Sequence, residues 1–284
     1  MILHEDWGDI LKILIFYNPY RVSYDYLSTE VRSVFEKYEN EIINIISAGS
    51  GIIDNSAQEA DCYVVFGGDG TVLRVAEISA INSKPIVGIN MGNLGFLSSY
   101  SQDEIENAAQ DLSKGEISFS ERHLIECFVG GKKFVSLNDI VLQKSQPLGT
   151  IDLEVIVGKS ILYSFLGDGV IVSTPTGSTG YSMSAGGPII DPSINVTEIV
   201  PLAPHTLNIR PFIISPDKYI ELKVNSIDTG FAYVTGDGDI IHRLEAGMSL
   251  VITGSDKKVK LSQKKGDNYF DLLNYKLGFG RRFE

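Results

Sequence analysis

The sequence has little cysteine and little histidine. Its 284 residues contain two cysteines, Cys62 and Cys127, which lie far apart and without metal-type spacing. The four histidines have no partner at ligand spacing either, and neither His-Glu-x-x-His nor Gly-x-Ser-x-Gly occurs. These absences exclude a disulfide scaffold and argue against a zinc hydrolase or a serine hydrolase of those types. We therefore expect two reduced, buried thiols.

Positive charge and long apolar runs are also scarce. There are 24 lysines and arginines against 36 acidic residues, a net charge of -12, and no apolar run approaches the ~18 residues of a membrane helix. The opening segment, MILHEDWGDI, lacks the pattern of a secretion signal. We expect a cytoplasmic protein without nucleic-acid or membrane partners. A local anion site is still compatible with this charge, because backbone amides can bind phosphate.

The chain alternates short apolar runs with helical patterns over its first hundred residues. Runs such as Leu11–Tyr17, Cys62–Phe66 and Ile86–Ile89 are apolar throughout, which is typical of a parallel sheet covered on both faces. A helical pattern from Val72 to Ala80 separates the last two. Residues 1–100 are therefore predicted to form an α/β domain.

The pattern changes after a further helix predicted at Asp103–Lys114. Short β-type segments separated by turn residues follow, among them Lys133–Val141 and Thr206–Ile214. We expect residues 101–254 to form a β-rich, sandwich-type domain, so that the fold class is α/β plus all-β. The last segment, 255–284, carries a short helix pattern at Tyr269–Leu277 that we expect to pack back on the N-terminal domain.

A glycine-rich turn lies between the expected strand Cys62–Phe66 and the helix that follows it. It reads Gly67-Gly68-Asp69-Gly70-Thr71, with Arg74 one turn further on. Glycines let a ligand approach the backbone, the start of a helix offers free N–H groups to an anion, and Thr71 could cap the helix. The turn matches neither a Walker loop nor a dinucleotide fingerprint. A plain structural turn is the alternative.

Two further clusters are less specific when each is taken alone. Gly88–Leu97 also follows a buried strand, and it includes Asn90 at the carboxyl edge where open α/β sheets place ligands. Asn138 and Asp139 interrupt the alternation of the expected strand Lys133–Val141. An asparagine can bind an adenine edge and a carboxylate can accept from ribose hydroxyls, but a local turn is the alternative.

The densest cluster runs from Gly167 to Pro188. Between Ser173 and Ser184 it is rich in serine, threonine and glycine, with a single aromatic residue, Tyr181. Such a segment suits a sugar phosphate or nucleotide, with Tyr181 available for stacking. A Ser/Thr/Gly linker is the alternative, although the preceding β-run and the proline indicate an ordered loop.

Taken together and in order, these clusters resemble the NAD kinase family. The resemblance rests on GGDGT at Gly67–Thr71, GINMGNLGFL at Gly88–Leu97, Asn138-Asp139, the long segment Gly167–Ile189, and PLAPHTLNIRP at Pro201–Pro211. GGDGT alone is shared with lipid and sphingoid-base kinases and loosely with phosphofructokinases. The Thr-Pro-Thr-Gly-Ser-Thr segment is far more specific.

The resemblance implies transfer of the γ-phosphate of ATP to the 2′-hydroxyl of the adenosine ribose of NAD. Asp69 would act as general base, and a divalent cation, Mg²⁺ for example, would be held largely by the nucleotide phosphates, so that no metal ligand is named. It also implies a homodimer or homotetramer. The residues expected to contact NAD or ATP are Gly67, Gly68, Gly70, Thr71, Arg74, Asn90, Asn138, Asp139, Asp168, Thr179, Gly180, Tyr181, Ser182, Met183, Ser184, Ala203, Asp237 and Asp239.

The chain departs from the family pattern at two of these positions. Gly180 stands where alanine is usual, and Asp239 stands where glutamine is usual. Two alternatives remain open from the sequence. One is a lipid or sphingoid-base kinase that shares GGDGT, and the other is a non-catalytic regulator that binds NAD or NADP.

Overall fold

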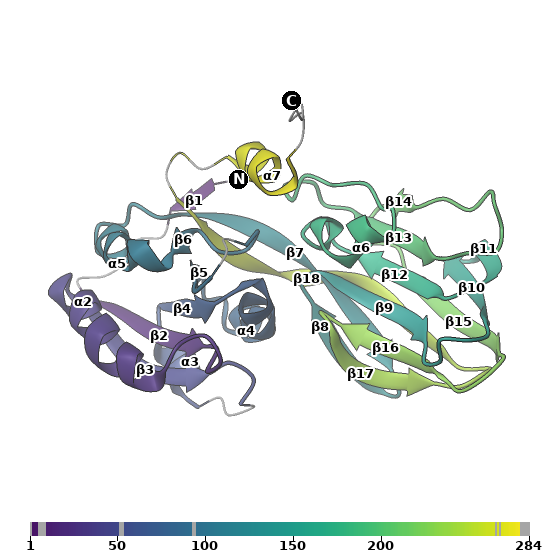
Figure 1. Cartoon of the computed structure of the whole chain (residues 1–284), viewed down its shortest axis with the longest axis horizontal. Helices are drawn as coiled ribbons and strands as arrows, with labels where there is room; N and C mark the ends of the chain where they lie inside the picture. Colours follow the sequence, from purple (N-terminus) through teal and green to yellow (C-terminus); the bar gives the residue numbers. More distant parts are fainter. Residues whose placement is uncertain are drawn as a thin grey trace. The chain divides into compact units, whose positions relative to one another are not determined.

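The computed structural model describes residues 10–50, 54–92, 95–264, 266 and 268–278, together with the backbone of residues 2–4 (Figure 1). Contacts divide the chain into two units. The first takes in residues 1–121 and 259–284, and the second takes in residues 122–258. The domain limits predicted at residues 100 and 254 stay predictions. No helix among the described residues is long and apolar enough to cross a membrane.

The first unit is built on a parallel sheet with the strand order β5-β4-β2-β3. Strands β4 and β5 are buried at every residue, which explains why the sequence runs are apolar without alternation. The strands are β2 (Leu11–Tyr17), β3 (Asn40–Ser47), β4 (Cys62–Gly67) and β5 (Ile86–Asn90). Short β6 (Tyr100–Ser101) pairs with β5, and short β1 (Ile2–His4) pairs with residues 118–120.

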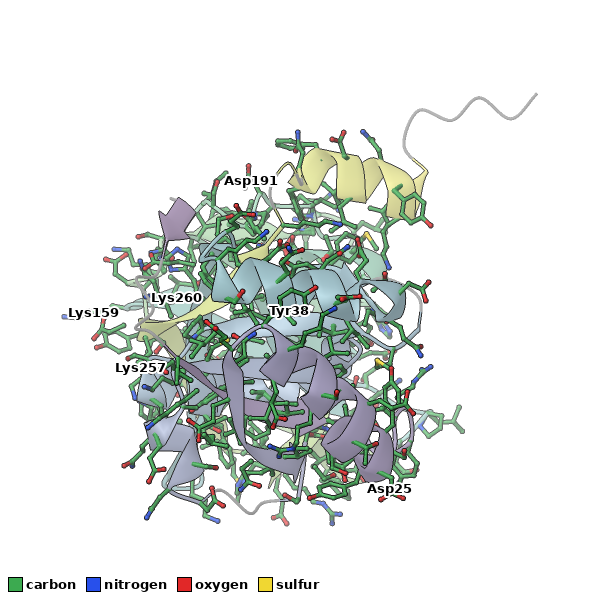
Figure 2. All side chains as sticks on the ribbon, turned by 90° about the vertical axis from the view of Figure 1, so that its left-hand side faces the viewer. Asp25, Tyr38, Lys159, Asp191, Lys257 and Lys260 are labelled. Atoms are coloured by element: carbon green, nitrogen blue, oxygen red, sulfur yellow. The ribbon has the colours of Figure 1, made fainter. Side chains whose placement is uncertain are left out.

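Helices cover this sheet. Phe35 and Leu112 from two of the helices join Ile13, Ile15 and Val64 in one buried cluster. The hydroxyl of Tyr38, labelled in Figure 2, donates a hydrogen bond of 2.9 Å to Glu106 and ties those two helices together at the surface. The helices are α1 (Tyr24–Tyr26), a π-helical stretch (Leu27–Val31), α2 (Arg32–Lys37), α3 (Ser56–Glu59), α4 (Asp69–Asn82), a 3₁₀ turn (Gln102–Glu104) and α5 (Ile105–Ser113).

The end of the chain belongs to the first unit by its contacts. Leu261, near the end of β18 (Ser249–Gln263), pairs with Ile86 in parallel. Leu273 of α7 (Tyr269–Leu277) is buried, and the ammonium of Lys276 lies 5.7 Å from the centre of the Phe96 ring. The short helix pattern read from the sequence is therefore a helix with one buried apolar side chain.

The second unit consists of antiparallel sheets. One has the order β14-β13-β12-β9-β16-β17, and the other contains β11, β10, β15 and the start of β18, while β7 pairs with β8. Side chains from both sheets share one core, for example Leu142 and Val170 with Leu153 and Leu222. The strands are β7 (Ser118–Val129), β8 (Lys132–Ser136), β9 (Asp139–Lys144), β10 (Ile151–Val157), β11 (Ser160–Gly167), β12 (Gly169–Ser173), β13 (Thr197–Leu202), β14 (Phe212–Ile214), β15 (Ile220–Ile227), β16 (Ala232–Gly236) and β17 (Asp239–Leu244).

Three expectations about local structure were wrong. The expected strand Lys133–Val141 is two strands, because β8 ends at Ser136 and β9 begins at Asp139. The helix expected from Val72 begins at Asp69. The strand expected at Thr206–Ile214 is confined to Phe212–Ile214, after Pro211, which has no N–H for a ladder hydrogen bond.

Candidate active site

The glycine-rich turn joins the carboxyl end of β4 to α4. Gly67 is required by packing, because a Cβ there would lie 2.1 Å from the hydroxyl of Thr71. That hydroxyl accepts the N–H of Gly68 at 3.4 Å. Thr71 therefore caps the glycine-rich turn from within the first turn of α4, and it is not the residue that precedes the helix. A Cβ at Gly68 or Gly70 would meet nothing within 4 Å. Packing within the chain therefore does not require those two glycines, and they leave space for a ligand.

Asp69 is the first residue of α4. One of its carboxylate oxygens accepts the N–H of Phe96 at 2.8 Å, and the other accepts the N–H of Leu97 at 3.1 Å. Gly95 makes this contact possible, because a Cβ there would lie 1.7 Å from Oδ1 of Asp69. The carboxylate is only partly buried and keeps free lone pairs, so it can also accept from a bound hydroxyl.

More polar side chains lie at the same sheet edge, close to the loops that follow β2, β3 and β5. Asn90 is buried and its side-chain oxygen accepts the N–H of Gly92 at 2.8 Å. The guanidinium of Arg74 lies 3.6 Å from the Cβ position of Gly49, and that of Arg21 lies 3.3 Å from the Cβ position of Gly92. Arg21 was not among the predicted residues, although it follows strand β2 at the carboxyl edge of the sheet. Asn93 and Leu94 of the expected motif lie outside the described residues.

In the second unit, Asp237 shapes the segment that interrupts the predicted strand. Asp237 has a φ of 50° in the turn between β16 and β17. Its carboxylate accepts the N–H groups of Leu137 at 2.8 Å, Asn138 at 2.7 Å and Asp139 at 3.2 Å. Asp237 was expected to contact a substrate, whereas in the structure its carboxylate is hydrogen-bonded to these three backbone N–H groups. Asp239 begins β17 and is exposed.

Asp139 is a buried residue beside Asp237, which is partly buried. Burial and the charge of Asp237 raise the pKa of Asp139 to about 7, and burial raises the pKa of Asp237 to about 6 against the effect of its three amide donors. The carboxylate of Asp237 is the member of the pair that accepts backbone N–H groups, whereas no described backbone N–H donates to the carboxyl group of Asp139. We conclude that Asp237 ionises first and that Asp139 holds its proton near neutral pH.

This pair predicts a pH effect on stability. In the unfolded chain Asp139 has an ordinary pKa near 3.8, so between about pH 4 and pH 7 the native state holds a proton that the unfolded state releases. The contribution of this proton to the free energy of unfolding is fully present below about pH 4, and it is lost as the pH rises through 7. From pH 5 to pH 8 the wild-type chain should lose about 2–3 kcal/mol more than Asp139→Asn, which cannot titrate. Urea unfolding at both pH values checks this, and equal losses in the two proteins would contradict it.

The loop after β12 is fastened to the same segment. The hydroxyl of Thr174 donates to the carbonyl of Leu137 at 2.6 Å, and the N–H of Thr174 donates to the carbonyl of Asn138 at 2.9 Å. A Cβ at Gly180 would lie 3.7 Å from the side-chain nitrogen of Asn138 and 3.9 Å from Oδ2 of Asp139. The loop therefore places Gly180 against both predicted residues. The buried Oδ1 of Asn138 has no hydrogen-bond partner among the described residues, so its capacity to accept a hydrogen bond is unused.

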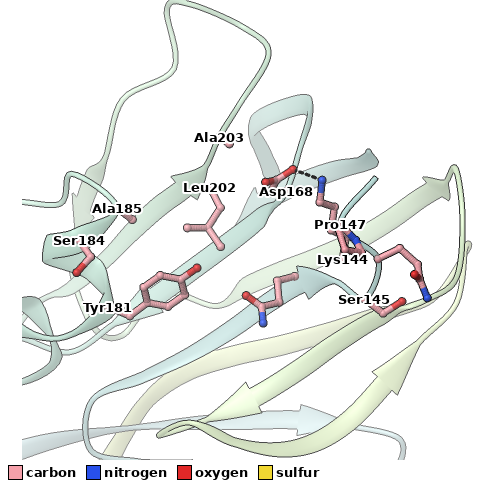
Figure 3. A pocket seen from close by; sticks show the side chains of 11 residues that line it. Lys144, Ser145, Pro147, Asp168, Tyr181, Ser184, Ala185, Leu202 and Ala203 are labelled. Carbon is pink, nitrogen blue, oxygen red and sulfur yellow. Dashed lines mark ion pairs between the residues drawn. The ribbon is translucent and has the colours of Figure 1, made fainter. Parts of the chain in front are cut away.

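A pocket of about 420 Å³ lies in the second unit (Figure 3). Tyr181 and Ser184 of α6 (Tyr181–Ser184) lie on one side of it, and an ion pair between Lys144 and Asp168, 2.6 Å long, lies on the other. This volume is in the range of small-molecule sites. Four predicted residues line it, namely Asp168, Tyr181, Ser184 and Ala203. Lys144 was missed, because a lysine late in a β-strand resembles any solvated lysine.

Within the predicted run Thr179–Ser184, Gly180 and three other residues do not line this pocket. The hydroxyl of Thr179, the last residue of the 3₁₀ turn Gly177–Thr179, donates to the carbonyl of Thr176, the residue before that turn. Met183 is half-buried. Ser182 is fully buried and donates to Glu198. Their predicted contacts with substrate therefore stay predictions.

Known proteins are similar to this chain over nearly its whole length. The sequence model of the ATP-NAD kinase N-terminal domain matches residues 21–117, and that of the ATP-NAD kinase C-terminal domain matches residues 137–263. An NAD kinase of Petrotoga mobilis is 57% identical over 274 residues, which cover 96% of this chain and 100% of that protein. An NAD kinase of Geotalea daltonii is 38% identical over 81% of this chain and 82% of its own length.

Solved structures have the same fold. A yeast NADH kinase complexed with NADH superposes with a TM-score of 0.84 over 98% of this chain and 90% of that one, at 21% identity. An NAD kinase of Archaeoglobus fulgidus in complex with ATP superposes with a TM-score of 0.73 over 94% of this chain and 99% of that one, at 23% identity. From the two domain matches and the identity to its relatives, the chain belongs to the NAD kinase family.

Proposed function

We propose that the chain transfers the γ-phosphate of ATP to the 2′-hydroxyl of the adenosine ribose of NAD and so makes NADP. The observation that carries this proposal is the position of Asp69. Its carboxylate stands at the start of α4, beside Gly68 and Gly70, where the chain leaves open space. A base beside a phosphate-binding turn is what transfer to an alcohol requires.

The first unit would bind the phosphoryl donor. Amides of Gly68 and Gly70 and the N-terminal end of α4 would contact the phosphates, and Asp69 would take the proton of the attacking hydroxyl. Arg74 and Arg21 are exposed, and neither has an ion-pair partner among the residues that the structure describes. Their charges are therefore available to the donor phosphates.

The second unit would bind NAD. The unpaired Oδ1 of Asn138 can accept from the exocyclic amine of adenine, and Asp139 can exchange hydrogen bonds with a ribose hydroxyl. The ring of Tyr181 is partly exposed at the pocket and is available for stacking. Asp168, paired with Lys144, adds a polar edge to the same pocket.

Magnesium would arrive as part of the nucleotide substrate. The described residues contain no group of three or more His, Cys, Asp or Glu side chains that could hold a metal ion. A Mg²⁺ ion bound chiefly by ATP phosphates needs no such group, and it would neutralise charge on the transferred phosphoryl group.

The test is the formation of NADP. The purified chain is incubated with NAD, ATP and MgCl₂, and NADP is measured by a dehydrogenase that accepts only NADP; reactions without ATP or without NAD are the controls. We expect NADP to form only in the complete mixture. If neither ATP, another nucleoside triphosphate nor polyphosphate gives NADP, the proposal is wrong. Phosphorylation of a sphingoid base or diacylglycerol in place of NAD would indicate a lipid kinase.

We also propose a cytoplasmic location and a homodimer or homotetramer. Cys62 and Cys127 are both buried, as is typical of a reducing compartment. Strand β14 is the edge of its sheet, and its Phe212 and Ile213 are about half exposed. An apolar edge strand is a natural contact between two copies of the chain. Sedimentation velocity tests the proposed oligomer, and a single monomeric species would contradict it.

A further inference from the structure

A buried carboxyl contacts α6, the helix that lines the pocket of the second unit. Glu198 of β13 and Ser182 of α6 are both 0% exposed, and the hydroxyl of Ser182 donates to Oε2 of Glu198 at 2.5 Å. The contact is closely packed, because a Cβ at Gly187 would lie 2.2 Å from the Ser182 hydroxyl and 2.6 Å from Oε1 of Glu198.

This carboxyl is costly for the fold. Oε1 of Glu198 has no hydrogen-bond partner among the described residues, so one hydrogen bond compensates the removal of the whole carboxyl group from water. Burial raises the pKa of Glu198, which reflects the same cost. Its neighbours Thr197 and Ile199 are also buried, and an apolar residue at this position would stabilise the strand more. Stability of the fold therefore does not explain the glutamate.

The geometry of α6 offers an explanation. This helix has only four residues and no side-chain cap, and Ser182 is its one fully buried member. With 100° between successive helical residues, Tyr181 and Ser184 lie about 60° apart, at about 100° and about 160° from Ser182, so both point in other directions than Ser182. These are the two helix residues that line the pocket. A hydrogen bond that fixes Ser182 therefore fixes the direction of Tyr181 and Ser184.

We propose that Glu198 is a positioning residue for NAD binding, because its hydrogen bond to Ser182 sets the orientation of α6 and so places Tyr181 and Ser184 at the pocket. The inference rests on the proposed function, in which this pocket binds NAD. Glu198 itself does not touch the substrate.

The test compares two variants of Glu198 and one control variant in kinetics and thermal unfolding. Glu198→Met keeps the side-chain length and removes both oxygens, so it should raise KM for NAD by about tenfold and leave KM for ATP within about twofold of wild type. Its Tm should equal or exceed that of wild type, because a buried carboxyl has been replaced by an apolar group. Glu198→Gln keeps an acceptor for Ser182 and should stay within about threefold of the wild-type KM for NAD. Thr197→Val, in the same strand and equally buried, is the control and should match wild type.

Ser182→Ala provides a second route if Glu198→Met does not fold. It should raise KM for NAD as Glu198→Met does, and where both fold the double variant should show no further increase, because the two side chains act through one hydrogen bond. A wild-type KM for NAD in Ser182→Ala overturns the inference. So does a Glu198→Met protein that loses Tm and raises both KM values in parallel, which indicates a purely structural role.

Tyr181→Ala separates failure of this inference from failure of the proposed site. An unchanged KM for NAD in Tyr181→Ala means that the pocket does not bind NAD, and the site assignment fails together with the inference. An increased KM in Tyr181→Ala with a wild-type KM in Glu198→Met overturns the positioning role alone.

Discussion

Replacement of Asp69 by asparagine is expected to lower kcat by about 10²–10⁴-fold, the usual contribution of a positioned general base. The change removes the proton acceptor and keeps the size of the side chain. Because Asp69 belongs to the first unit and the proposed NAD contacts to the second, KM for NAD should change little. Steady-state kinetics with saturating ATP and Mg²⁺ measure both quantities. Near-normal turnover would contradict the assignment of Asp69 as the base.

The contacts of Asp69 add a second expectation to this variant. The carboxylate accepts the N–H groups of both Phe96 and Leu97, whereas an asparagine has only one oxygen to accept with. Asp69→Asn should therefore also loosen the loop after β5, at a cost of about 1–3 kcal/mol of stability. If anchoring this loop were the whole role of Asp69, the variant would raise KM values while kcat stayed near wild type.

Two further variants separate these roles. Asp61→Asn is the matched control, because the Asp61 carboxylate also accepts a backbone N–H, that of Lys12 at 2.9 Å, at the opposite end of β4; its kcat should equal that of wild type. Gly95→Ala keeps the carboxylate and displaces it, because the new Cβ would lie 1.7 Å from Oδ1 of Asp69. A large loss of kcat in Gly95→Ala would show that the position of the carboxylate matters as well as its presence.

The elements of the first unit could be predicted from the sequence for a physical reason. A strand buried on both faces needs an apolar side chain at every position, and β4 and β5 satisfy this in runs too short for helices. The start of α4 was misplaced because the residues before Val72 are glycine, aspartate and threonine, which are typical of turns. In the structure they form the first turn of the helix.

The candidate site was predicted less completely, because its geometry depends on residues far apart in the sequence. The break between β8 and β9 requires the carboxylate of Asp237, about a hundred residues away, to accept three N–H groups at Leu137 to Asp139. No local pattern encodes that contact. The same holds for Glu198. It lies in the buried strand β13, which was not predicted from the sequence, and its hydrogen-bond partner Ser182 lies in α6.

Gly177→Ala is expected to destabilise the second unit by about 3 kcal/mol, the upper end of the usual cost of overpacking, because a clash with backbone cannot be relieved by a rotamer change. Its Cβ would lie 2.2 Å from the carbonyl oxygen and 2.6 Å from the carbonyl carbon of Asn138. Both are backbone atoms, so the loop after β12 or the Asn138 segment must move. That carbonyl also accepts the N–H of Thr174, and its movement breaks the attachment of the loop.

Gly180→Ala is the matched control for this prediction, three residues further along the same loop. Its Cβ would lie 3.1 Å from the carbonyl oxygen of Gly177 and at ordinary contact distance from Asn138 and Asp139, at a negative φ of -95°. We expect a change of stability within about 1 kcal/mol, since only a small shift is needed. Urea unfolding of both variants gives the comparison, and an equal loss in the two would mean that contact with the Asn138 carbonyl does not hold the loop. A large loss of stability confined to Gly177→Ala would indicate that contact between backbone atoms holds the loop, and with it Gly180, beside Asn138. Alanine at position 180 would then only add a methyl group without displacing the loop.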